Sequence, residues 1–279
     1  MPSYELTGLA GKVAVVTGAG RQRSIGRPCA VELARAGCDI VLTGTGRSPD
    51  RYPEDEQRVG WRDIESVADE VRALGRRCET FVSDVRDPAA VNALVIEVLA
   101  RFGQVDIVVN NAGAARGADR VPVIDLEPDV WNNVLTTNLT GTFLMSRAFG
   151  RVLKSQGHGG SIINMSSIAG KLLPENTAAY AASKAGIQAL TAAMSREMAR
   201  YNVRVNAICP GIIDTARMDD IDAIERGAAW QAMIRERIPL GRAGRGEDIA
   251  WITVFLCSDQ GAWITGQSWN VDGGHVTAH

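Results

Sequence analysis

The sequence predicts a doubly wound α/β fold, a parallel sheet of about seven strands with helices covering both faces. Short apolar runs rich in β-branched residues alternate with helical periods along the chain. A glycine-rich turn directly follows the first of these runs, as in a βαβ unit. Hydrophobic residues make up 46% of the 279 residues, and no repeat or long linker divides them. We therefore expect one domain over residues 1–279.

The predicted strands are short and apolar, as strands buried on both faces of a sheet usually are. They cover residues 13–17, 40–42, 80–82, 107–109, 161–165, 203–208 and 268–271. The clearest helical period between them has apolar residues three and four apart, at Val91, Leu94, Val95, Val98, Leu99 and Phe102. This alternation predicts parallel pairing, because successive parallel strands need a crossover connection.

The turn after the first strand is a candidate phosphate site. It reads Gly18-Ala19-Gly20-Arg21-Gln22-Arg23-Ser24-Ile25-Gly26 and leads into a helical period that ends near Gly37. Glycines let the backbone approach a ligand closely, and the unpaired N–H groups of a helix start attract a pyrophosphate. A glycine-rich turn alone is weak support, but its position after the first strand favours a nucleotide.

Two polar segments interrupt the alternation. Residues 44–63 follow the second strand and form either a solvated surface loop or a loop at the edge of the cofactor. Residues 212–245 follow a late strand and carry a modest helical period with Trp230, which suits a substrate lid. Trp230 can equally pack the lid helix onto the body of the protein.

A tyrosine and a lysine lie one helical turn apart at Tyr180 and Lys184, and the pair Ser166-Ser167 precedes them. A phenol titrates near ~10. A cation fixed beside it stabilises the phenolate and lowers that pKa. Tyr180 would then exchange protons with a carbonyl/alcohol pair, provided that another group supplies the hydride. Taken alone, the two residues also fit an ordinary helix.

The composition argues against several other classes of protein. A formal net charge of −2 gives no basic footprint for nucleic acid, and no apolar run reaches membrane-spanning length. The N-terminus carries no signal-peptide pattern, and five scattered cysteines indicate reduced thiols in a cytoplasmic protein. Three histidines without ligand spacing predict no metal site.

Motifs over nearly the whole chain resemble those of the short-chain dehydrogenase/reductase family. In chain order they are Thr17-Gly18-x-Gly20 with Ile25-Gly26, Asp84-Val85, Asn110-Asn111-Ala112-Gly113, Asn138-Leu139-Thr140-Gly141, Met165-Ser166-Ser167, Tyr180-x-x-x-Lys184, Pro210-Gly211 and Val271-Asp272-Gly273-Gly274. One motif can arise by chance, whereas the ordered set is specific. The resemblance implies a Rossmann fold, hydride transfer to or from a nicotinamide, a small carbonyl or alcohol substrate, and a homotetramer or homodimer.

The glycine turn departs from the family's common pattern, Thr-Gly-x-x-x-Gly-Ile-Gly. Residues 21–24 make this turn two residues longer, and the middle glycine is missing. Its length and its Ser24-Ile25 pair are similar to the turn of bacterial enoyl reductases. Those enzymes separate their Tyr and Lys by six residues, whereas three residues separate Tyr180 and Lys184. We therefore expect a carbonyl/alcohol enzyme with a lengthened phosphate turn.

The resemblance assigns four catalytic residues. Tyr180 is the expected general acid and base, and Ser167 is expected to hydrogen-bond the substrate oxygen. Lys184 lowers the pKa of the phenol and holds the nicotinamide ribose, while Asn138 anchors a water that relays protons to Lys184. Two alternatives stay open, in which Ser166 exchanges roles with Ser167 or Asn138 is a helix-interior amide that bonds to backbone.

The same resemblance predicts a set of cofactor-binding residues around the strand ends. Asp84 is expected to accept the adenine amino group, and Ile213 and Thr215 to meet the nicotinamide carboxamide, although Ile213 also suits the core. The whole set is Gly18, Gly20, Arg21, Arg23, Ser24, Ile25, Gly26, Arg47, Asp84, Val85, Asn110, Ala112, Gly113, Tyr180, Lys184, Pro210, Gly211, Ile213 and Thr215.

The end of the second strand bears on the choice of cofactor. An acidic residue there binds the ribose 2′-hydroxyl of NAD and repels the 2′-phosphate of NADP. Here the chain reads Leu42-Thr43-Gly44-Thr45-Gly46-Arg47, without a carboxylate. Because Arg47, with Arg21 or Arg23, can pair with a phosphate, the sequence favours NADP(H) over NAD(H).

Two other functions stay open. A 3-oxoacyl-[acyl-carrier-protein] reductase would use a basic patch for its acidic carrier, with Arg116, Arg120 and Arg147 as candidates. A non-catalytic NAD(P)-sensing regulator would share the fold but usually lacks a catalytic side chain, and all four are present here. An apolar, cyclic or aromatic substrate is suggested by apolar residues near the expected pocket, namely Leu172, Leu173, Met218 and Trp230.

Overall fold

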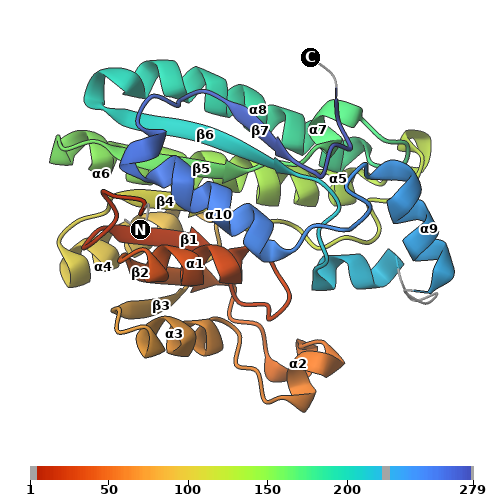
Figure 1. Cartoon of the computed structure of the whole chain (residues 1–279), viewed down its shortest axis with the longest axis horizontal. Helices are drawn as coiled ribbons and strands as arrows, with labels where there is room; N and C mark the ends of the chain where they lie inside the picture. Colours follow the sequence, from red (N-terminus) through yellow and green to blue (C-terminus); the bar gives the residue numbers. More distant parts are fainter. Residues whose placement is uncertain (1–4, 222–226, 278–279) are drawn as a thin grey trace.

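A parallel sheet forms the centre of the computed structural model, which describes residues 5–221 and 227–277. In this part of the chain seven strands pair in the order β3-β2-β1-β4-β5-β6-β7 (Figure 1). They are β1 (Val13–Thr17), β2 (Asp39–Gly44), β3 (Cys78–Val82), β4 (Ile107–Asn110), β5 (Gly160–Met165), β6 (Val203–Pro210) and β7 (Ser268–Val271). The predicted strands and the predicted fold class are confirmed.

Helices connect the strands and cover the sheet. They are α1 (Gly26–Arg35), α2 (Glu54–Arg58), α3 (Ile64–Ala73), α4 (Pro88–Phe102), α5 (Pro128–Leu135), α6 (Gly141–Gln156), α7 (Ala169–Leu172), α8 (Ala178–Met198), α9 (Ala228–Arg237) and α10 (Gly246–Cys257). Local sequence sets the ends of α4, since the Asp87 side chain accepts a hydrogen bond from the Ala89 N–H and Gly103 ends the helix at φ 75°.

Alternate residues of the central strand pack on opposite faces of the sheet. Val13 and Val15 of β1 contact the cluster built by α4, α6 and α8. Ala14 and Val16 contact the cluster built by α1, α3 and α10. Both faces of β1 are thus buried, which explains why its sequence is continuously apolar rather than alternating.

The strand order reverses at the centre of the sheet, because β1 pairs with β2 on one side and with β4 on the other. In doubly wound folds the ligand crevice lies at such a point, beyond the carboxyl ends of the strands. The glycine turn, the loop after β4 and the loop after β5 all leave the sheet at this end. The fold therefore gathers the predicted motifs at one edge of the sheet.

Three expectations from composition can be compared with the described residues. None of their helices combines the length and apolar character needed to cross a membrane. All five cysteines are free and buried, as the sequence predicts. No group of three or more metal-ligating side chains comes together in this part of the chain.

Candidate active site and cofactor cleft

The four predicted catalytic residues come from three neighbouring elements. Tyr180 and Lys184 lie one turn apart on α8, and Ser167 follows the end of β5. The Lys184 ammonium donates to the Met165 carbonyl at 2.7 Å, which ties α8 to the end of β5. Asn138, between α5 and α6, donates to the Ser183 hydroxyl at 2.9 Å. All four residues are thus held together at the carboxyl edge of the sheet.

The two serines after β5 have different surroundings. Ser166 is buried and donates to the Lys184 carbonyl at 2.8 Å, while it accepts a hydrogen bond from the Gln188 amide at 3.0 Å. Ser167 accepts from the Ala169 N–H at 3.1 Å, and its side chain hydrogen-bonds Tyr180. Ser166 is therefore committed to holding α8, whereas Ser167 adjoins the phenol.

Three cations surround the Tyr180 ring. The guanidinium carbons of Arg120 and Arg217 lie 4.6 and 4.9 Å from the ring centre, and the Lys184 ammonium lies at 5.7 Å. Burial acts to raise the pKa of Tyr180, but Arg217, Lys184, the Ser167 hydrogen bond and Arg120 together lower it below 10.0. The sequence identified Lys184 as the tuning cation and missed Arg217.

Lys184 itself is buried, and burial is the main cause that lowers its pKa; Arg217 lowers it further, while Tyr180 acts in the opposite direction. Desolvation disfavours an ammonium, and a nearby phenolate favours it. The protonation of Lys184 and Tyr180 is therefore coupled, so that the two titrate as a pair.

Asn138 lies in a π-helical stretch, Thr136–Thr140, which joins α5 to α6. Its side-chain oxygen accepts from the Ala114 N–H at 2.8 Å, and its amide donates to Ser183 as described above. A π-helical turn often marks a functional position because it opens the regular hydrogen-bond ladder. The amide-to-backbone bond is the alternative that the sequence left open, and it fixes the loop after β4.

The glycine turn is docked on the loop after β4. Gly18 has a φ of 67°, and a Cβ there would come within 2.7 Å of the Ala112 Cα, so only glycine fits. The Asn111 amide donates to the Thr17 and Gly18 carbonyls at 2.9 and 3.0 Å. Asn111 was not among the predicted cofactor residues, although it belongs to the same motif.

The Asn110 side chain points elsewhere than the sequence predicted. It is buried and donates to Ser146 and Asn164 at 2.9 and 2.8 Å, in the interior between β4, β5 and α6. Its side chain therefore stabilises the core instead of bordering the adenosine. The period-two alternation of β4 explains this, because neighbouring residues point to opposite sides.

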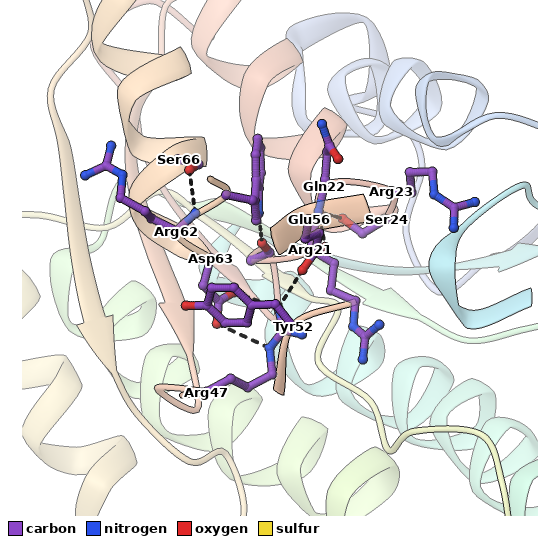
Figure 2. Close-up of polar contacts among 12 residues, drawn as sticks. Arg21, Gln22, Arg23, Ser24, Arg47, Tyr52, Glu56, Arg62, Asp63 and Ser66 are labelled. Carbon is purple, nitrogen blue, oxygen red and sulfur yellow. Dashed lines mark hydrogen bonds and ion pairs between the residues drawn. The ribbon is translucent and has the colours of Figure 1, made fainter. Parts of the chain in front are cut away.

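The loop between β2 and α3 clasps the lengthened turn (Figure 2). The Trp61 indole donates to the Gly20 carbonyl at 2.6 Å, and Glu56 accepts from the Gln22 N–H at 2.8 Å. Arg23 pairs with Asp55 at 3.1 Å. Residues 44–63 therefore pack on the glycine turn and are more than a solvated surface loop.

Asp63 brings a carboxylate to the end of β2. A Cβ on Gly20 would overlap its side chain, and a Cβ on Gly44 would lie 4.0 Å from its Oδ2. Arg47 donates to both carboxylate oxygens, at 3.2 and 3.3 Å, as Figure 2 shows. The backbone of Asp63 has φ 52°, which an aspartate rarely adopts and which the clasp must stabilise.

No carboxylate directly follows β2 in the sequence, but in the structure the side chain of Asp63 lies next to the end of that strand. Besides Asp63, the buried Glu56 lies 3.6 Å from the Arg47 guanidinium. Arg47 is thus already engaged by two carboxylates, and Arg23 by Asp55 and, at 3.7 Å, by Asp214. Within the described residues, Arg21 makes no side-chain hydrogen bond or ion pair, and Figure 2 shows it without a partner.

The remaining residues of the predicted cofactor set either line the carboxyl edge of the sheet or pack behind it. Arg86 donates to both carboxylate oxygens of Asp84 and holds the pKa of that carboxyl below its usual value. Ser24 donates to the Arg21 carbonyl and braces the turn. Ile213 is buried in the core, as its alternative interpretation predicted. The others that support the cleft are Ile25, Gly26, Val85, Ala112, Gly113, Pro210, Gly211 and Thr215.

The predicted lid contains a 3-10 helix, Ala216–Ile221, and α9; residues 222–226, with Ile224 of the predicted period, lie outside the described residues. Figure 1 shows α9 at the same end of the molecule as α5 and α7. The segment is tied to the turn, because the Ala216 N–H donates to the Arg23 carbonyl at 2.9 Å. Trp230 is partly buried, which is compatible with both of its proposed roles.

Known proteins resemble this chain over nearly its full length. A family model described as enoyl-(acyl carrier protein) reductase matches residues 18–276. The 2-dehydro-3-deoxy-D-gluconate 5-dehydrogenase of Escherichia coli (strain K12) is 35% identical over 95% of this chain and 96% of its own. The 3-oxoacyl-[acyl-carrier-protein] reductase of that strain is 33% identical over 95% and 97%. A solved short-chain type dehydrogenase/reductase from Mycobacterium marinum superposes with a TM-score of 0.84, at 30% identity over 98% of each chain.

Proposed function

The chain belongs to the short-chain dehydrogenase/reductase family of oxidoreductases, and we propose that it interconverts a ketone and a secondary alcohol through Tyr180. The observation that carries the proposal is the phenol itself, which has a lowered pKa and adjoins Ser167 and Lys184 at the carboxyl edge of the sheet. A group with that pKa can give a proton to a carbonyl oxygen and take it back from an alcohol.

The cleft fits a nicotinamide dinucleotide. Gly18 lets the backbone of the turn come close to a ligand, and the first turn of α1 has no acidic residue to repel a pyrophosphate. Arg21 lies in the glycine turn itself, and among the described residues its guanidinium has no ion-pair partner, so it can meet a phosphate. When bound, the nicotinamide supplies or accepts the hydride at the carbonyl carbon.

The chain's own groups move the proton. During reduction, Tyr180 donates its proton to the carbonyl oxygen, on which negative charge grows, and Ser167 donates a hydrogen bond to the same oxygen. Lys184 and Arg217 stabilise the phenolate that is left behind. Asn138 holds the loop after β4 against α8, and Lys184 is proposed to hold the ribose. Oxidation uses the same groups in reverse.

The related proteins do not agree on one substrate, so their names do not choose it. A 3-oxoacyl-[acyl-carrier-protein] reductase stays the second candidate because such an enzyme is among the relatives. Its expected basic patch gains little support, since Arg120 pairs with Asp119 and stacks on Tyr180. A cofactor-sensing regulator is less favoured, because all four catalytic side chains are present and come together.

For the cofactor, the sequence favours NADP(H), whereas the contacts of Arg47 support NAD(H). The bidentate Arg47–Asp63 pair leaves carboxylate lone pairs that can accept ribose hydroxyls. A 2′-phosphate there would face both Asp63 and Glu56. We therefore propose that Asp63 takes the role of the missing strand-end acid and that NAD(H) binds more tightly than NADP(H).

The location and the oligomeric state are proposed from the family and from two features of the structure, its buried thiols and its exposed tryptophans. Five buried free thiols support a cytoplasmic location. Trp263 is fully exposed and Trp269 is partly exposed near the C-terminus, which supports a subunit interface there. We propose a homotetramer or homodimer that binds a small-molecule substrate.

The test of the function is an absorbance assay with NADH and NADPH against a panel of ketones and one acyl thioester, together with the reverse reaction on alcohols. We expect turnover of at least one carbonyl by the wild-type protein and almost none by Tyr180→Phe. Equal turnover by both proteins, or cofactor binding without any turnover across the panel, would contradict the proposal.

A further inference from the structure

Positive charge exceeds negative charge around Tyr180. Arg120, Arg217 and Lys184 all contact its ring. Among the described residues, the carboxylate paired with this group is that of Asp119, which binds Arg120. Ionisation of Tyr180 would balance one further cation. Counted over the described residues, one positive charge is left over beside the reacting group, even with the phenolate formed.

Of the three cations around Tyr180, Arg217 is the one with a buried donor that lacks a partner in the described structure. Its Nη1 donates to the carbonyl of Ala114 at 2.7 Å, the residue whose N–H donates to Asn138. Its Nη2 is buried and has no hydrogen-bond partner in the described structure. A buried guanidinium donor without a partner costs free energy, so in a native protein it calls for an explanation such as a functional role or a bound ion or water.

The position of Arg217 connects the lid to the chemistry. It lies in the 3-10 helix Ala216–Ile221, at the start of the predicted lid, and its guanidinium reaches the ring of Tyr180. A substrate whose carbonyl lies at the phenol would therefore lie close to the Arg217 guanidinium. Guanidinium groups bind carboxylates in a planar, two-pronged geometry that neutral groups match poorly.

We propose that the substrate is a small oxo acid or hydroxy acid, whose carboxylate binds Arg217 with help from Arg120 a few bonds from the reacting carbon. The inference rests on the proposed function and specifies its substrate class. In reduction, the carbonyl carbon gains the hydride, its oxygen gains the Tyr180 proton, and the carboxylate is unchanged. The apolar, cyclic or aromatic substrate suggested by the sequence is thereby replaced.

The experiment compares each small oxo acid of a panel with its neutral methyl ester. Wild-type protein, Arg217→Gln and Arg217→Lys are assayed for kcat and KM, and cofactor affinity is measured by fluorescence titration. Arg217→Gln keeps a donor for the Ala114 carbonyl but loses the charge. Arg235→Gln is the matched control, because Arg235 is an exposed arginine on α9 of the same lid.

We expect the wild-type protein to prefer an acid over its ester by about a hundredfold in kcat/KM, the range of one charged hydrogen-bonded contact. Arg217→Gln should remove most of this preference, mainly through KM of the acid, and Arg217→Lys should restore part of it. The change in Tyr180 affects acid and ester alike, so the ratio isolates the carboxylate contact. Arg235→Gln should leave the ratio unchanged.

Three results would overturn the inference. They are a wild-type preference for esters, an equal loss of acid and ester in Arg217→Gln, and a weaker cofactor affinity that accounts for the whole effect. The last result would assign Arg217 to the cofactor. If the protein reduces neutral ketones but no acids, the inference fails and the proposed function stands; if it turns over no carbonyl or alcohol at all, the proposed function fails.

Discussion

The arginines at the two ends of the proposed cleft differ in whether they have carboxylate partners. At the cofactor end, Arg47 is held by Asp63 and Glu56, and Arg23 is held by Asp55. At the chemical end, Arg217 contacts the Tyr180 ring without a carboxylate partner in the described structure. Similar side chains thus serve opposite purposes, depending on whether an acid accompanies them.

The difference indicates what each end binds. A paired arginine positions its carboxylate, which suits the neutral hydroxyls of a ribose and opposes an added phosphate. An unpaired arginine next to a phenol lowers the pKa of that phenol and attracts an anion. The predictions below, from the largest expected effect to the smallest, change one of these ends while the other serves as reference.

The largest effect is expected at the phenol. Tyr180→Phe removes the proton donor and should lower kcat by roughly a hundredfold to ten-thousandfold, the range of general acid–base catalysis. The cofactor should still bind, because the glycine turn and Lys184 are untouched; a fluorescence titration measures this. A variant that keeps normal turnover would mean that Tyr180 is not the acid.

A change at Asp63 should alter the preference of the protein between NADH and NADPH. Asp63→Ala removes one of the two carboxylates that hold Arg47 and leaves Glu56, so NADH should bind about ten- to a hundredfold more weakly while NADPH binds more tightly. Asp55→Ala is the control, because it removes another acid of the same loop that pairs with Arg23 instead. Wild-type preference for NADPH, or an equal change for both cofactors, would restore the NADP(H) expectation.

The pH dependence should report the charge around Tyr180. Its pKa is lowered, so oxidation, which needs the phenolate, should rise with pH with its midpoint below 10.0. Reduction needs the protonated phenol and should fall as pH passes the same value. Arg217→Gln removes the first of the causes that lower this pKa, and both profiles should therefore move to higher pH. Unchanged profiles would mean that Arg217 does not lower the pKa of Tyr180.

The smallest effect is expected in the loop between β2 and α3, which holds the glycine turn. Trp61→Phe removes the hydrogen bond to the Gly20 carbonyl and should lower the free energy of unfolding by about 0.5–1.5 kcal/mol. NADH and NADPH should both bind somewhat more weakly, without a change in preference. Trp251→Phe, an exposed tryptophan on α10, is the control for the loss of an indole in a thermal melt.

Part of this structure follows from local sequence. The strands are continuous runs of buried apolar residues, and the cap at Asp87 with Gly103 at the other end sets α4. Tyr180 and Lys184 share a face because helical spacing requires it. The family motifs then place Ser167 and Asn138 beside them. Each of these features depends on neighbouring residues or on a pattern that the chain shows directly.

What only tertiary structure decided involves contacts between distant segments. Asp63 reaches the end of β2 through a loop whose path no periodicity predicts, so the sequence showed a strand end without an acid. Asn110 and Asn111 look equivalent in the motif, but the direction of β4 sends them to different sides. Arg217 meets Tyr180 because α8 begins and β6 ends at the same edge of the sheet.

The sequence by itself therefore determined the fold, the shared helix face of Tyr180 and Lys184, and the position of the glycine turn. Tertiary structure decided which arginines carry partners, and with them the proposed cofactor and substrate. The physical reason is that backbone preferences act between near neighbours, whereas the effect of a charge depends on every group that folding brings within a few ångströms.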